Sequence, residues 1–69
     1  MGAAKEWYDK GVAFGNLGKL QEAIDCYDRA LEIDPRYAKA LHNKAVALNK
    51  LGRHNEAVEC LDKAKEIDH

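Results

Sequence analysis

The chain has 69 residues, 46% of them hydrophobic, and its 11 basic and 12 acidic residues leave a net charge of -1 at pH 7. Eleven residues are Ala, only six are Val or Ile, and Ser and Thr are absent. This composition excludes a sheet of β-branched strands, hydroxyl nucleophiles of the Ser or Thr type, and any overall electrostatic attraction to nucleic acid or an anionic membrane.

A thin, Ala-rich interior favours closely packed helices, because Ala is the best helix former and adds little volume. We therefore expect an all-α fold. No apolar run approaches the roughly 18 residues of a membrane span, and charged residues from Lys5 onward exclude a secretory signal. We therefore expect a soluble, cytoplasmic protein. No general base is paired with a nucleophile or with a set of metal ligands, so we expect that the protein is not an enzyme and uses no cofactor.

The first expected helix is marked by apolar spacing over residues 7–17. Trp7, Gly11, Phe14 and Leu17 recur every three or four residues, which is typical of one face of a helix. Gly18 follows directly, and glycine commonly ends a helix in the left-handed conformation. The first helix is therefore predicted to stop at this glycine.

A second helical stripe follows over residues 20–31. It is closed by Asp34 and Pro35, with Asp placed to cap the next helix and Pro pre-set for that helix's first turn. Two further stripes, over residues 41–51 and 57–64, continue the pattern. The chain is thus predicted to form four helices joined by short turns.

The second pair of helices repeats the first. A shift of 34 residues aligns residues 4–35 with residues 38–69, and 15 of these 32 pairs are identical. Gly18 aligns with Gly52, at the expected turns. A period of this length indicates helix-turn-helix units stacked in a solenoid. We predict one domain over residues 1–69, with repeats at 4–37 and 38–69.

The repeated positions resemble the signature of the tetratricopeptide repeat (TPR) family. Those that match are Trp7, Gly11, Phe14, Ala23, Tyr27, Ala30 and Pro35 in the first repeat, and Leu41, Ala45, Leu48, Ala57, Leu61 and Ala64 in the second. The resemblance implies a short right-handed superhelix whose concave surface, lined by the first helix of each repeat, receives a peptide or a partner helix. Small residues, Gly11 with Ala23 and Ala45 with Ala57, would let the paired helices approach closely.

The chain departs from the family pattern at four positions. Lys10 and Lys44 stand where Leu is usual, and we expect their alkyl stems to lie over the core with the ammonium groups in water. Lys65 replaces the apolar residue matched by Leu31, and His69 replaces the closing Pro. The last two departures bear on whether another repeat follows directly.

The concave face carries the candidate binding residues, which line the expected first helix of each repeat. They are Lys5, Tyr8, Asp9, Val12, Gly15 and Asn16, followed by Lys39, His42, Asn43, Val46, Asn49 and Lys50. Three Lys against one Asp give this face a charge of +2, whereas acidic residues dominate the outer face. We expect an acidic protein or peptide partner, with Asn side chains bonding its backbone and Tyr8 or Val12 offering apolar contact.

The ends of the array leave a second interpretation open. Terminal repeats normally carry polar caps, and we expect the Trp7 side of the first helix and Ala57, Leu61 and Ala64 on the last to face water. The chain could then be a self-assembling unit, joined end to end or by exchange of helices as a homodimer, or a fragment of a longer array.

Cys26 and Cys60 occupy equivalent places in the two repeats. Equivalent points on stacked helix pairs lie about 10 Å apart, beyond the roughly 7 Å that a disulfide allows between Cα atoms. A zinc site with His42 and His54 would lack the short Cys spacing of zinc modules. We expect two thiols packed on the second helix of each repeat, and no bound metal.

Overall fold

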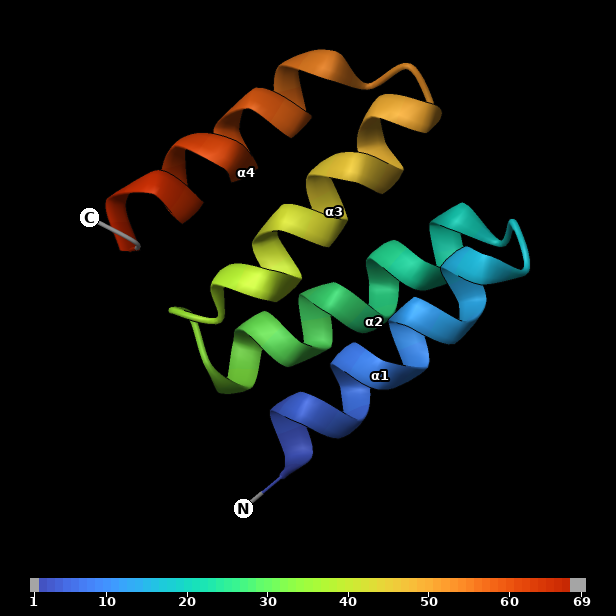
Figure 1. The fold of residues 1–69 in the computed structure, drawn as a ribbon, viewed down its shortest axis with the longest axis vertical. Coiled ribbons are helices and arrows are strands. Elements are labelled where there is room, and N and C mark those ends of the chain that lie inside the picture. Colours follow the sequence, from blue (N-terminus) through green and yellow to red (C-terminus); the bar gives the residue numbers. More distant parts are fainter. Residues whose placement is uncertain (1, 68–69) are drawn as a thin grey trace.

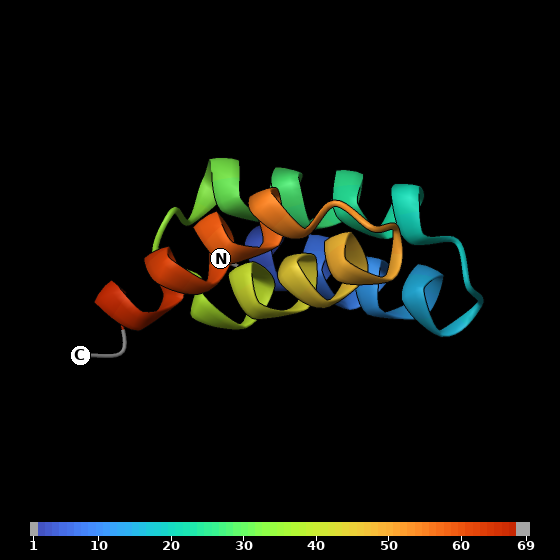
Figure 2. The same ribbon diagram turned by 90° about the horizontal axis from the view of Figure 1, so that it is seen from above.

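The computed structural model describes residues 2–67 and folds them into four helices. They are α1 (Ala3–Asn16), α2 (Leu20–Ile33), α3 (Ala38–Lys50) and α4 (His54–Ile67). Each helix packs against the next along the chain (Figure 1). Helix α1 also touches α3. Figure 2 shows α1 and α3 at the same level, with α1 behind α3, and α2 in a second layer above them. The all-α prediction is confirmed. The departure from the family pattern at His69 lies outside the described residues.

The turns within the two helix pairs have the same geometry. Gly18 and Gly52 have φ values of 78° and 79°, so the predicted left-handed glycines are confirmed. In the first turn the Lys19 backbone N–H donates to the Phe14 carbonyl at 2.9 Å. The Arg53 N–H donates in the same way to Leu48 at 2.8 Å. The same two carbonyls also accept a bond at 3.1 Å, from the Leu17 and Leu51 N–H groups, so the end of each helix is closed by paired backbone bonds.

The link between α2 and α3 differs from the prediction. Asp34 ends α2, and its Oδ1 accepts a hydrogen bond from the Arg36 backbone N–H at 3.1 Å. Pro35 lies in the turn, and α3 begins only at Ala38, where Tyr37 precedes it without a side-chain cap. The expectation that Asp34 caps the next helix and Pro35 starts it was wrong, because the Asp34 carboxylate stabilises the turn itself.

Two apolar clusters form the core. In the first cluster, Ala23, Tyr27 and Ala30 of α2 pack with Ala40 of α3, and partly buried side chains of α1 cover them. A second cluster, built around Leu48, joins α2, α3 and α4. Gly11 is buried against α2, but its nearest neighbour there is the ring of Tyr27 rather than Ala23. The close approach of the first helix pair therefore depends on the absence of a Cβ atom opposite an aromatic ring.

The structure corrects the expected exposure of the last helix. Ala57 and Ala64 are 1% and 8% exposed, because they face α3 within their own repeat, and Leu61 is half-buried. Val58 is 54% exposed instead. On the other end of the array Trp7 is half-buried, with Lys10 Nζ 5.3 Å and Arg29 Cζ 5.9 Å from its ring centroid.

Candidate partner-binding groove

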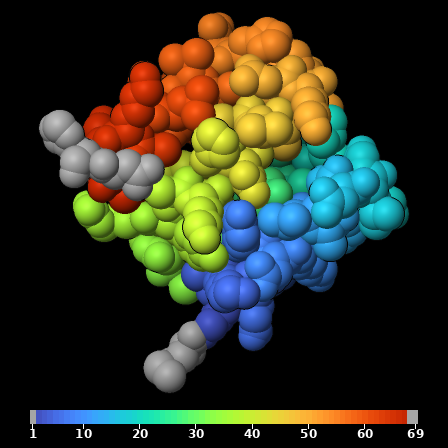
Figure 3. All heavy atoms as spheres, in the orientation of Figure 1, coloured from blue at the N-terminus to red at the C-terminus, as the bar shows by residue number. Residues whose placement is uncertain are grey.

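Nine of the twelve predicted binding residues line two adjoining hollows on the face formed by α1 and α3. Figure 3 shows this face, with α2 visible between the other two helices. The first hollow, called here the helix hollow, has a volume of about 190 Å³, and residues of α2 form its floor. Its walls and floor are Val12, Gly15, Asn16, Leu20, Ala23, Tyr27, Asn43, Val46, Ala47 and Lys50.

The second, called here the turn hollow, lies beside the link between α2 and α3. It is lined by Tyr8, Asp34, Arg36, Tyr37, Ala38, Lys39, His42, Asn43 and Ala64. Asn43 borders both hollows, and the two together are called the groove. The helix hollow has room for one or two side chains and falls below the roughly 300–1000 Å³ of pockets for drug-sized ligands.

Tyr8 and Asn43 cross the groove between its two hollows. The Asn43 Nδ2 donates to the Tyr8 hydroxyl at 3.0 Å, and this bond joins α1 to α3. The Tyr8 ring stacks on Tyr37 at 5.2 Å between centroids and lies tilted against Tyr27 at 5.9 Å. Two residues predicted to contact a ligand separately are therefore bonded to each other and fix the spacing of the helices.

Burial in this aromatic cluster affects two phenols. It raises the pKa of Tyr27 above the usual value, and the nearby Asn43 amide opposes the rise. Burial likewise raises the pKa of Tyr37, with a smaller contribution from the Asp9 carboxylate. Both phenols are therefore neutral at physiological pH and can donate a hydrogen bond to a carbonyl or a carboxylate.

Three predicted residues lie outside both hollows. Lys5 Nζ is 2.8 Å from Asp9 Oδ2, and this bond raises the pKa of the Lys5 ammonium. The Asn49 Oδ1 is 2.8 Å from Nδ1 of His54, the first residue of α4. The side chains of these residues are already engaged within the protein.

Sequence reasoning missed Arg36 and Tyr37 in the turn hollow and Tyr27 in the floor of the helix hollow. Arg36 and Tyr37 belong to the link before α3, and helical periodicity says nothing about linking residues. Tyr27 matched a core position of α2, so a role in the groove was not considered. The position of Pro35 just before two large side chains was the available signal that this link is ordered.

The two cysteines are free and buried, as expected of packed thiols. Burial raises the pKa of both Cys26 and Cys60, so neither is an activated thiolate. Among residues 2–67 no three His, Cys, Asp or Glu side chains gather where they could hold a metal ion. Within the same residues, no helix is long and apolar enough to cross a bilayer.

The fold and its two repeated helix pairs define a class of helical-repeat proteins, and comparisons with known sequences identify the family. Two tetratricopeptide repeat models match the chain, one over residues 4–37 and one over residues 26–59. The chain belongs to the tetratricopeptide repeat family. The second match spans the end of one repeat and the start of the next, so the expected boundaries of the second repeat, 38–69, stay a prediction.

The chain resembles part of several larger proteins. It is 51% identical over 35 residues to the TPR repeat-containing protein MJ0941 of Methanocaldococcus jannaschii, covering 51% of this chain and 10% of that one. It is 40% identical over 37 residues to the uncharacterized protein MJ0572 of the same organism, and the match covers 54% of this chain and 43% of that protein. The chain therefore spans less than half the length of either relative.

Solved structures give the same result for the fold. The crystal structure of MamA superposes with a TM-score of 0.93 at 29% identity, covering 94% of this chain and 38% of that one. A MamA mutant superposes with a TM-score of 0.92 at 36% identity, and the match covers 96% of this chain and 48% of that one. These matches and the family assignment place the chain among protein-interaction and scaffold modules.

Proposed function

We propose that the groove of α1 and α3 binds a peptide or partner helix that carries acidic side chains. The observation that carries the proposal is the charge of its rim. Arg36, Lys39 and Lys50 border the two hollows, and none of them is paired with a carboxylate among residues 2–67. Asp9 is already bonded to Lys5. Asp34 is the one carboxylate of the described residues that lines the two hollows, so three cations leave this lining with an excess of two positive charges for an acidic ligand.

The helix hollow supplies the apolar part of the contact. Val12 and Val46 flank it from α1 and α3, and Val46 is 42% exposed. Gly15 lines the same hollow, and an added Cβ there would make only ordinary van der Waals contacts, 3.8 Å from Tyr27 Oη and 4.0 Å from Ala23 Cβ. Helix propensity favours Ala over Gly at such a position by about 0.5–1 kcal/mol, which supports a role for Gly15 in close approach by a ligand backbone.

An NMR titration tests this function. The ¹⁵N-labelled protein is titrated with a Glu-rich peptide and with the same peptide carrying Gln in place of Glu. We expect shifts centred on Val12, Gly15 and Val46 with the acidic peptide, and binding that weakens as salt is added, because the rim charges are exposed and screened. Equal shifts with both peptides, or none, would refute an acidic ligand.

A charge-matched pair of variants locates the site. Lys39→Glu with Lys50→Glu reverses two rim charges and should abolish the shifts. Lys19→Glu with Lys63→Glu makes the same change in net charge at exposed positions that line neither hollow, and it should leave most of the binding intact. Comparable losses in both double variants would mean that net charge, and not the groove, attracts the peptide.

A further inference from the structure

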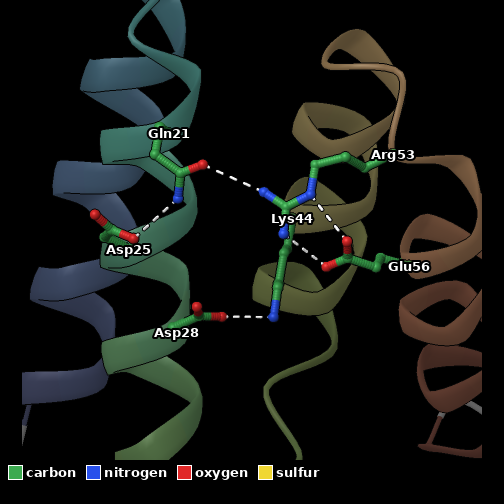
Figure 4. Close-up of polar contacts among 6 residues, drawn as sticks. All are labelled: Gln21, Asp25, Asp28, Lys44, Arg53 and Glu56. Atoms are coloured by element: carbon green, nitrogen blue, oxygen red, sulfur yellow. Dashed lines mark hydrogen bonds and ion pairs between the residues drawn. The ribbon is translucent and has the colours of Figure 1, made fainter.

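Side-chain contacts between the two repeats show how one repeat packs on the next. Among residues 2–67, three polar contacts between side chains cross from the first repeat to the second. Lys44 Nζ pairs with Asp28 Oδ1 at 2.6 Å, and Arg53 Nη1 donates to Gln21 Oε1 at 3.2 Å (Figure 4). The third is the bond from Asn43 to Tyr8. The Lys44 ammonium was expected to reach water, and it instead binds the neighbouring repeat.

Each of these contacts has a counterpart at the ends of the chain, 34 residues away. The positions matching Lys44 and Asp28 are Lys10 at the start and Asp62 at the end, which are the same residue types. Those matching Arg53 and Gln21 are Lys19 and Asn55, again a cationic donor and an amide acceptor. Both polar contacts could therefore form again between the start of one chain and the end of another.

The third contact also has a complementary counterpart, in which the donor and the acceptor exchange places between the two matching positions. Asn43 donates to Tyr8 within the chain, and the matching residues are Asp9, an acceptor, and His42, whose ring N–H donates. A fourth pair of counterparts consists of charged residues, although the matching contact between the two repeats is apolar. Ala40 and Leu31 pack in one cluster, and their counterparts are Glu6 and Lys65, of opposite charge.

The apolar surfaces match in the same way. The α2–α3 interface buries Ile24 to 3% exposure, whereas its counterpart Val58 is 54% exposed. On the facing helix Leu41 and Leu48 are 5% and 0% exposed, while the matching Trp7 and Phe14 are half-buried. The two end faces are thus the two halves of the internal interface, left without a partner among the described residues.

We propose that these end faces bind each other, so that α1 of a second copy of this chain docks on α4 as α3 docks on α2. Glu6 and Lys10 of one copy then pair with Lys65 and Asp62 of the next, and Trp7 covers Val58. Such a head-to-tail contact does not close on itself, so it extends the superhelix and its groove from chain to chain. It goes beyond peptide binding and does not depend on it.

Sedimentation velocity over a dilution series from about 1 μM to about 1 mM, the range of weak association, tests the proposal. We expect the average mass to rise with concentration above 7.7 kDa. Trp7 is the single Trp, and its emission should shift to the blue in parallel as the ring takes the place that Leu41 occupies within the chain. A monomer with unchanged emission throughout would overturn the proposal.

Charge reversal distinguishes this geometry from other dimers. Glu6→Lys places two cations together at the junction, Lys65→Glu places two anions there, and each should weaken association about tenfold or more. An equimolar mixture of the two variants restores opposite charges at every junction and should assemble again. A symmetric dimer through one end would respond to only one of the variants, and failure of the mixture to assemble would refute head-to-tail pairing.

Two controls keep the result interpretable. Glu59→Lys and Lys63→Glu make the same charge changes on α4, away from the positions that match the internal contacts, and should leave association unchanged. Helical circular dichroism should show that all four variants are folded, because none of the altered side chains is buried or bonded within residues 2–67. Equal effects of the controls and the junction variants would also overturn the proposal.

Discussion

The contact between Gly11 and Tyr27 provides a direct test of how the first helix pair is packed. A Cβ atom on Gly11 would lie 2.6 Å from Cε1 and 2.8 Å from Cδ1 of the ring. The ring is 4% exposed and so cannot swing into solvent. Overpacking costs about 1–3 kcal/mol, and Ala regains about 0.5–1 kcal/mol of helix propensity. Gly11→Ala should therefore lower the free energy of unfolding by up to about 2.5 kcal/mol.

Gly15→Ala is the matched control, because it makes the same change one helical turn further along α1. Its Cβ would meet no atom closer than 3.8 Å, so only helix propensity acts and the variant should be more stable by about 0.5–1 kcal/mol. Urea unfolding followed by circular dichroism at helical wavelengths measures both. For a domain of this size 1 kcal/mol moves Tm by about 4–8 °C, so the opposite signs are easily resolved.

The second repeat contains the compensating change. Ala45 stands where the first repeat has Gly11, and Leu61 stands where it has Tyr27. Combining Gly11→Ala with Tyr27→Leu copies that arrangement, so a double-mutant cycle should show a coupling of about 1 kcal/mol or more in favour of the pair. Additive effects, or a Gly11→Ala variant as stable as Gly15→Ala, would refute the proposed steric conflict.

Two further predictions concern ionisation. Two hydrogen bonds from Arg53, at 2.8 and 2.9 Å, lower the pKa of Glu56. The pair therefore stabilises the fold fully when the pH is above the ordinary pKa of Glu. This contribution to stability is lost as the pH falls through the lowered pKa. In a carboxyl NMR titration Arg53→Met should raise the pKa of Glu56, and an unchanged titration would show that the pair does not form in solution. Burial raises the pKa of Cys26 and Cys60, so alkylation at pH 8 should be slow until urea is added; equal rates with and without urea would contradict their burial.

Local pattern was sufficient for the helices and the repeat, because periodicity and turn chemistry act within a few residues. Gly18 and Gly52 were identified from their place after an apolar stripe, and both have the expected positive φ. The same reasoning failed at the ends of the array. Ala57 and Val58 are neighbours in sequence, and periodicity alone does not say which of two adjacent stripes on α4 meets α3 and which is left exposed.

The sequence by itself determined that this chain is an all-α pair of helical repeats, and it predicted a cationic face along the first helix of each repeat. The tertiary structure alone decided how that face is divided, because the bond from Asn43 to Tyr8 joins residues 35 positions apart. It also decided that Lys44 links the two repeats through Asp28. Such contacts depend on the spacing and rotation of whole helices, which are set by packing around rings such as Tyr27 and are not encoded in any local pattern.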